Sequence, residues 1–252
     1  MQTLTEIYPK PWCVAPERLE INPDEIHIWM INLNESKNDI DQVKSLLSMD
    51  EYLRMERFRH EERRDCFAIA HGALHEILGN YLNVSPEIIN FNYNYHHKPS
   101  ISTATNRLNL DFNLSHSAEL AVIGIARNRR IGVDIERISD DRLSGRIPER
   151  FFSLQETRSL RSLPKEQQLT AFFSCWTRKE AYVKARGLGL ALPLAEFTVS
   201  LAPGEKPALL EMKSDPSEIE NWSLVDIELP AGYCGAVAVE GKKFSLEHYY
   251  FQ

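Results

Sequence analysis

The order in which strand-like and helical segments follow one another limits the fold more than any other feature of this sequence. Residues 24–33 (EIHIWMINLN) alternate with period two and predict a first strand. A helical region follows from about Asp39 to Asn80, with its end expected at Asn80 or near Asn83. Residues 89–95 (INFNYNY) alternate again, so strands are expected on both sides of a long helical region.

The middle of the chain predicts a β-hairpin. Residues 110–119 (LDFNLSHSAE) are typical of a tight turn, because they are rich in short polar side chains. An apolar strand at 120–126, a basic turn at 127–130 and a second strand at 131–138 then follow. The two strands are expected to pair across the basic turn.

The second half repeats the helix-and-strand order of the first. Residues 140–186 are mostly helical, with breaks near Pro148, Ser153 and Pro164. From about residue 195, strand-like runs (FTVSL, WSLVDIEL, YCGAVAVE) alternate with turns. Each half is thus expected to hold a small sheet and a long helix. This is an α+β fold, and the boundary between the halves is expected in the basic turn.

Composition narrows the classes of protein. The 252 residues are 43% hydrophobic, which is ordinary for a soluble globular chain. The charge sum of 29 basic and 36 acidic residues, −7, argues against a nucleic-acid binder. The four cysteines are far apart and predict neither a zinc site nor a disulfide framework. The first residues (MQTLTEIYPKPW) do not read as a secretory signal, and Leu120–Ala126 is too short to span a membrane, so a cytoplasmic protein is expected.

Two carboxylates stand close together in Gly132-Val133-Asp134-Ile135-Glu136. On a strand, Asp134 and Glu136 share one face, while Val133 and Ile135 point to the other. Two neighbouring carboxylates repel each other, and a cation between or beside them lowers that cost; oxygen ligands suit Mg²⁺. An exposed edge strand that carries two acids on its polar face explains the same pattern.

A helix carries a third acid and an ammonium beside a tryptophan. Trp176, Glu180 and Lys184 lie along one stripe of the predicted helix, which ends at Gly187 and Gly189. A surface ion pair between Glu180 and Lys184 is one interpretation. The tryptophan favours a partly buried stripe, and the glycines permit a loop that approaches a ligand closely.

Two further segments could contact phosphate. The residues Asn113-Leu114-Ser115-His116-Ser117 either satisfy local backbone groups at a turn or hold a phosphate with hydroxyls and a histidine. Lys98 is a cation whose neighbour Pro99 is stiff. His96 and His97 are adjacent on an extended segment and point apart, which argues against a metal pair.

Taken in order, these motifs resemble a known family. Four motifs together resemble those of the 4'-phosphopantetheinyl transferase superfamily, in its surfactin-synthetase-activating, single-chain type. They are K-P at 98–99, N-L-S-H-S at 113–117, G-V-D-I-E at 132–136 and W-T-R-K-E-A-x-x-K-x-x-G-x-G-L at 176–190. The resemblance runs from about Arg57 to Pro193. It implies two similar subdomains in a pseudo-twofold arrangement, each a mainly antiparallel sheet on a long helix. The halves would be 1–126, which contacts coenzyme A, and 127–252, with the active site in the cleft between them.

The resemblance also implies roles for individual residues. Mg²⁺ would be bound by Asp134, Glu136 and Glu180. Coenzyme A would be contacted by Lys98, Ser115, His116, Lys184 and, for the 3'-phosphate, Arg64. Glu180, Lys184 and His116 would act in catalysis, with Glu180 as the base. Gly187 and Gly189 would shape the loop after the helix.

The implied reaction is transfer of phosphopantetheine from coenzyme A to a serine of an apo acyl or peptidyl carrier protein. A monomer with neither nucleic-acid nor membrane partner is expected. The carrier protein is expected to dock through Arg127, Arg129 and Arg130, or through Arg178 and Arg186. The family commonly has glycine where His97 stands, and often arginine where His71 stands. One alternative is a catalytically idle protein that binds coenzyme A or a carrier. Another is a different Mg²⁺-dependent phosphoryl enzyme, although no G-x-x-x-x-G-K-[ST] motif occurs.

Overall fold

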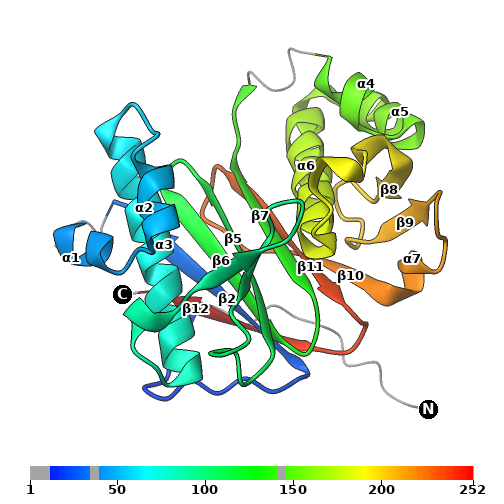
Figure 1. Ribbon diagram of the computed structural model, residues 1–252. Helices are drawn as coiled ribbons and strands as arrows, with labels where there is room; N and C mark the ends of the chain where they lie inside the picture. The colour runs from blue at the N-terminus through cyan, green and yellow to red at the C-terminus, as the bar shows by residue number, and fades with distance from the viewer. Residues whose placement is uncertain (1–11, 35–39, 141–145, 252) are drawn as a thin grey trace.

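The computed structural model describes residues 12–34, 40–140 and 146–251, and in these ranges it combines α-helices with four β-sheets (Figure 1). The predicted helix start at Asp39 and residues 141–145 of the second helical stretch lie outside the described ranges. None of the described helices has the length and apolar character that a membrane span needs. The expected mixed α and β class is confirmed.

The largest sheet is built mostly from the first half of the chain. Its strand order is β1 (Cys13–Val14), β12 (Ser245–Tyr250), β2 (Glu25–Asn32), β6 (Leu120–Arg127) and β5 (Leu110–Ser117). β12 runs parallel to β1 and β2, whereas the pairs β2–β6 and β5–β6 are antiparallel. The last strand of the chain therefore returns to the first sheet, and a division at residue 126 does not separate the sheets completely.

The second sheet is antiparallel and belongs to the second half. Its order is β10 (Trp222–Asp226), β11 (Tyr233–Glu240) and β7 (Ile131–Arg137). Two short hairpins complete the strands: β3 (Phe91–Tyr93) with β4 (Pro99–Ile101), and β8 (Phe197–Val199) with β9 (Leu209–Met212). β7 is an end strand of its sheet, with β11 on one side only.

Two helices of 22 residues dominate, α3 (Glu61–Leu82) and α6 (Lys165–Arg186). Each ends where the next residue has a left-handed backbone: Asn83 has φ of 52° and Gly187 has φ of 63°. The shorter helices are α1 (Ile40–Ser45), α2 (Met49–Met55), α4 (Ile147–Phe151), α5 (Leu154–Ser162) and α7 (Glu218–Asn221), with 3₁₀ turns at Pro86–Ile88, Gly189–Ala191 and Leu194–Glu196.

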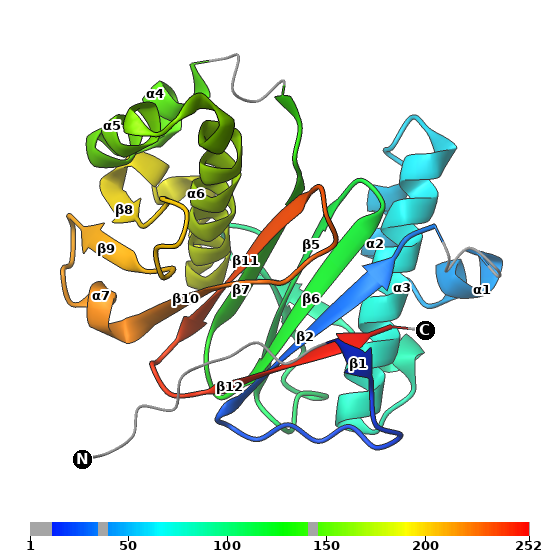
Figure 2. The ribbon, with the colours of Figure 1, turned by 180° about the vertical axis from the view of Figure 1, so that it is seen from behind.

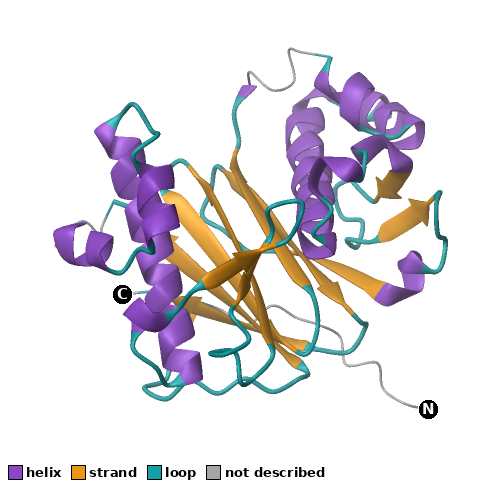
Figure 3. Ribbon diagram, viewed as in Figure 1, coloured by secondary structure: helices purple, strands orange, loops and turns teal. Residues whose placement is uncertain are grey.

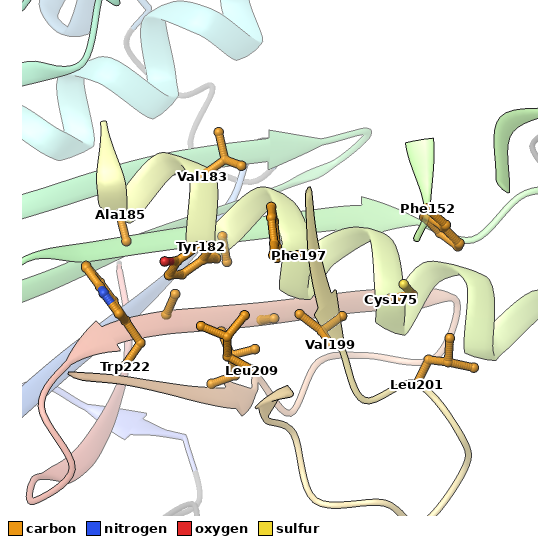
Figure 4. Packing of buried hydrophobic residues seen from close by; sticks show 14 of the residues in the cluster. Phe152, Cys175, Tyr182, Val183, Ala185, Phe197, Val199, Leu201, Leu209 and Trp222 are labelled. Atoms are coloured by element: carbon orange, nitrogen blue, oxygen red, sulfur yellow. The ribbon is translucent and has the colours of Figure 1, made fainter. Parts of the chain in front are cut away.

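The core lies in three layers of apolar side chains. The outer face of the first sheet packs on α3, and the two sheets meet around residues such as Ile28, Val122 and Val133. The second sheet packs on α6, where Tyr182 and Trp222 meet edge to face (Figure 4). The two long helices consequently lie on opposite sides of the pair of sheets (Figures 1 and 3), and the view from behind shows the same order (Figure 2).

Two predictions about the middle of the chain are wrong. Residues 110–117 are a strand and not a turn, and the turn lies after them, where Ala118 has φ of 52°. The strands at 120–127 and 131–137 do not form a hairpin, because β6 pairs with β2 and β5 while β7 pairs with β11. Alternating polar side chains made the first of these strands look like a turn. The strands β1, β4, β9 and β12 and the helix α7 were not predicted.

Candidate active site

The site begins with a close approach of β7 to α6. A Cβ atom at Gly132 would lie 2.2 Å from the carbonyl oxygen of Ala181 and 2.3 Å from the backbone nitrogen of Ala185. Only glycine leaves room for such contact between a strand and a helix backbone. Because side chains alternate along a strand, Asp134 and Glu136 share the face of Gly132, which is turned toward α6.

Lys184 of α6 bonds directly to the strand. Its Nζ lies 2.7 Å from Oδ1 of Asp134, 2.9 Å from Oγ of Ser115 and 3.2 Å from the carbonyl oxygen of Val133. The Asp134 side chain is only 7% exposed, so this is an ion pair with little access to solvent. The ammonium pairs with Asp134 of β7, so the interpretation of Lys184 as part of an isolated surface pair with Glu180 is wrong.

Glu180 completes a group of acids around this pair. Burial raises the pKa of Glu180, and the neighbouring carboxylate of Asp134 raises it further; Lys184 opposes this, and Glu136 adds to the rise. The three carboxylates thus lie within electrostatic reach of one another, and their oxygens are ligands that Mg²⁺ accepts. Among the residues that the structure describes, however, no three His, Cys, Asp or Glu side chains are gathered as a metal site, and Lys184 supplies the positive charge at Asp134.

Lys98 is held by three acceptors of the protein. Its Nζ donates to Oδ2 of Asp111 at 2.8 Å, to the carbonyl oxygen of Ile131 at 3.1 Å and to that of Ala185 at 3.3 Å. An ammonium has three protons, so all of its donors have partners in this arrangement. Asn94 adds a bond from Nδ2 to the carbonyl oxygen of Gly187 at 2.8 Å. The β3–β4 hairpin is thereby tied to the end of α6.

His97 has a backbone conformation that favours glycine. Its φ is 64° in the turn before Lys98. For a residue with a Cβ, the left-handed region costs about 1–2 kcal/mol. This explains why a glycine fits the position that precedes the Lys-Pro pair.

We expect His97→Gly to raise the free energy of unfolding. Relief of left-handed strain exceeds the extra entropy of glycine in the unfolded chain, and the net gain is about 0.5–1 kcal/mol. Urea unfolding measures it, with His96→Gly as the matched control, because residue 96 has no positive φ. A loss of stability in His97→Gly, equal to that in His96→Gly, would contradict this account.

His116 and Arg64 are the other two predicted contacts. His116 lies on β5 with its side chain partly open to solvent; partial desolvation lowers its pKa, and the charges of His71 on α3 and Lys184 on α6 lower it further. Arg64, on the first turns of α3, donates from Nε to the carbonyl oxygen of Phe58 at 2.8 Å. Their roles toward coenzyme A stay predictions.

A buried acid on α2 was missed in the sequence. Glu51 is fully buried and accepts from Nδ1 of His71 at 2.7 Å and from Nε2 of His75 at 2.8 Å. Burial opposes ionisation of Glu51, but the two histidines hold its pKa well below the usual range. Burial lowers the pKa of His75, yet the Glu51 carboxylate outweighs it and the pKa is raised, whereas for His71 burial wins and the pKa is lowered. His71, where the sequence resemblance leads us to expect an arginine, is thus part of a buried acid–histidine cluster.

We expect Glu51→Gln to lower the free energy of unfolding by about 3 kcal/mol near pH 6, because it leaves a buried His75 without its counter-charge. The pKa of His75 is raised on folding, so the stability gained from its charge is complete below the ordinary histidine pKa and is lost as pH rises through the raised value. The difference in unfolding free energy between Glu51→Gln and the unchanged protein should therefore shrink toward about pH 9. Urea titrations at both pH values measure it, with Glu56→Gln as an exposed control. A deficit independent of pH would contradict the charge argument.

A cavity of about 650 Å³ opens beside these residues. Its charged wall includes Lys98, Glu180 and Lys184. Trp176 lines it as well and packs edge to face on Phe151, with ring centres 5.8 Å apart. Further apolar lining comes from the loop after α6: Leu190, Leu192, Pro193 and Leu194. The helix therefore places its acid and its ammonium where a ligand has both charged and apolar walls.

The arginines suggested for docking are largely engaged within the chain. Arg178 is 3% exposed and bonds both carboxylate oxygens of Asp226, so it is not available to a partner. Arg186 forms an ion pair with Glu218, and Arg130 forms a bidentate ion pair with Glu240. Arg127 and Arg129 each donate to a backbone carbonyl. The prediction that Arg178 contributes to a docking patch is therefore wrong, whereas docking roles for the other arginines stay predictions.

Comparison with known proteins agrees with the motifs. Residues 130–238 match the profile of the 4'-phosphopantetheinyl transferase superfamily. The chain is 38% identical over 230 residues to the 4'-phosphopantetheinyl transferase HetI of Nostoc sp., covering 91% of this chain and 94% of HetI. It is 27% identical over 210 residues to the 4'-phosphopantetheinyl transferase Sfp of Bacillus subtilis, covering 83% and 89%. A solved holo-acyl-carrier-protein synthase of Helicobacter pylori, in complex with coenzyme A, is 28% identical and covers 44% of this chain and 99% of that one, with a TM-score of 0.33. With a match to HetI that extends over nearly the whole of both chains, this chain belongs to the 4'-phosphopantetheinyl transferase superfamily.

Proposed function

We propose that this chain transfers the 4'-phosphopantetheine group from coenzyme A to a serine of an apo acyl or peptidyl carrier protein, as a cytoplasmic monomer that requires Mg²⁺. The observation that carries the proposal is the cluster of Asp134, Glu180 and Lys184 on the facing surfaces of β7 and α6, where Glu180 and Lys184 line the cavity. Relatives named for this activity match 91% and 83% of the chain. The two-half organisation is supported by the equal length of α3 and α6, each packed on one sheet.

The transfer makes one phosphorus–oxygen bond and breaks another. The serine oxygen of the carrier bonds to the β-phosphorus of coenzyme A, and the bond to adenosine 3',5'-bisphosphate breaks. Lys184 and His116 stabilise negative charge on the diphosphate. Glu180 takes the proton of the serine hydroxyl, a role that suits a carboxylate whose pKa is raised by burial and by its acidic neighbours. Such reactions depend on positioning and charge neutralisation more than on covalent help from the protein.

Asp134, Glu136 and Glu180 are the residues that would hold Mg²⁺. The ion, when bound, neutralises the diphosphate and aligns it. In the present arrangement the Lys184 ammonium lies beside the Asp134 carboxylate. It supplies there the positive charge that the ion would bring to the same carboxylate. Lys98, Ser115, His116 and Arg64 are proposed contacts of coenzyme A, with the halves 1–126 and 127–252 on either side of the cleft.

Mass spectrometry of a carrier protein tests the proposal. Incubation of the protein with coenzyme A, Mg²⁺ and an apo carrier should add one phosphopantetheine unit to the carrier. Addition of EDTA should stop the transfer, and excess Mg²⁺ should restore it. Binding of coenzyme A without transfer to any of several carriers would instead identify a catalytically idle binding protein.

A further inference from the structure

The outer edge of β7 has an unusual set of partners. In its sheet β7 pairs only with β11, so the alternate backbone groups on its other edge need partners elsewhere. Those groups belong to Ile131, Val133, Ile135 and Arg137, whose N–H groups point away from β11 toward β5. No backbone ladder joins β7 to β5 among the paired strands of the described residues.

Side chains of β5 take the place of that ladder. Every second residue of β5 accepts from the backbone N–H that lies twenty positions later in β7. The bonds are Ile131 N to Asp111 Oδ2 (2.9 Å), Val133 N to Asn113 Oδ1 (2.8 Å), Ile135 N to Ser115 Oγ (3.4 Å) and Arg137 N to Ser117 Oγ (3.0 Å). Four consecutive N–H groups on this edge are thereby satisfied.

Two lysines cap the carbonyl groups of the same edge. Lys98 donates to the carbonyl oxygen of Ile131 at 3.1 Å, and Lys184 donates to that of Val133 at 3.2 Å. Lys98 comes from the β3–β4 hairpin and Lys184 from α6, so three elements besides β11 converge on one strand. Motifs that are distant in the sequence therefore meet along the edge of β7.

The serines of β5 also reach the acids of β7. Ser115 donates from Oγ to Oδ1 of Asp134 at 3.1 Å, and Ser117 donates from Oγ to Oε2 of Glu136 at 3.1 Å. Each hydroxyl thus accepts from a backbone N–H and donates to the carboxylate of the preceding residue. A single hydroxyl can make both bonds, because it has one proton and two lone pairs.

We propose that the four polar side chains of β5 form a seam between the two halves that sets the position of β7, and that Ser117 is a positioning residue for Glu136. The positioning role rests on the proposed function, whereas the seam does not. Bonds to both the backbone and the carboxylate leave Glu136 fewer orientations than a strand edge in solvent would. The geometry assigns the alternating polar pattern 111–117 this structural task.

Hydrogen exchange tests the seam without any catalysis. Asn113→Ala should make the Val133 amide exchange about tenfold faster, and Ser117→Ala should do the same for the Arg137 amide, because each amide loses its acceptor. Ser223→Ala is the matched control: Ser223 lies in β10, which β11 separates from β7, and donates to the carbonyl oxygen of Gly241 at 2.7 Å. Unchanged exchange at the Arg137 amide in Ser117→Ala overturns the seam, whether or not Asn113→Ala folds.

Steady-state kinetics test the positioning role. Ser117→Ala should lower kcat for carrier modification about tenfold and leave KM for coenzyme A within about twofold, and Ser117→Thr, which keeps a hydroxyl, should restore kcat. Ser223→Ala should match the unchanged protein. Faster Arg137 exchange with an unchanged kcat overturns the positioning role of Ser117. Absence of transfer by the unchanged protein overturns the proposed function and the positioning role, and the seam is then judged by exchange alone.

Discussion

Asp134→Ala lowers the rate constant for phosphopantetheine transfer by about 10³-fold, the largest loss expected from any single side chain of the site. Its carboxylate is nearly buried, bonds Lys184 at 2.7 Å and accepts from Ser115 at 3.1 Å. Removal takes away one proposed ligand of Mg²⁺ and the counter-charge that orients Lys184. Both effects act on the charge of the diphosphate in the transition state, so kcat should fall more than KM rises.

The matched control is Asp226→Ala. Asp226 also pairs with a basic residue of α6, because its Oδ2 lies 2.6 Å from Nη2 of Arg178, but it stands on β10 outside the cavity. Both variants break an ion pair between a strand of the second sheet and the same helix. We expect Asp226→Ala to keep a rate near that of the unchanged protein, with carrier mass as the readout for both. Equal rates for Asp134→Ala and the unchanged protein would remove Asp134 from the mechanism.

Local sequence patterns were sufficient to predict part of the fold and part of the candidate site. Period-two alternation located β2 and placed Asp134 and Glu136 on one face of β7. Helical spacing and the glycine at 187 gave α6 its position and its end. These features depend on residues within a few positions of one another, which is the range over which backbone periodicity acts.

The errors concern contacts between distant residues. The polar residues of β5 alternate as a strand requires, but without knowledge of β7 they resemble a turn that satisfies its own backbone. Strand pairing across about a hundred residues, as between β7 and β11, leaves no local signal. The same is true of Glu51, whose burial depends on His75 from another helix. Period-two polarity at 111–117 was the one available hint of the seam.

Gly132→Ala tests the contact on which the site geometry depends, and we expect it to lower the free energy of unfolding by about 3 kcal/mol or more. The added Cβ would lie 2.2 Å from the carbonyl oxygen of Ala181, and 2.3 Å from the backbone nitrogen of Ala185. Both are backbone atoms inside a long helix, so neither can move without displacing α6 from β7. A displaced helix carries Lys184 away from Asp134, and transfer should be lost even where the variant folds.

Gly124→Ala provides the comparison, because Gly124 is likewise in a strand of the core. Its added Cβ would meet side-chain atoms only, 2.6 Å from Cγ1 of Val133 and 2.8 Å from Cδ1 of Ile131. Side chains can turn aside, and the expected cost is about 1–2 kcal/mol with transfer retained. Urea unfolding and the carrier mass assay measure both variants. If Gly132→Ala were no less stable than Gly124→Ala and equally active, α6 could not be held against β7 by backbone contact, and the placement of Glu180 and Lys184 over the strand would need another cause.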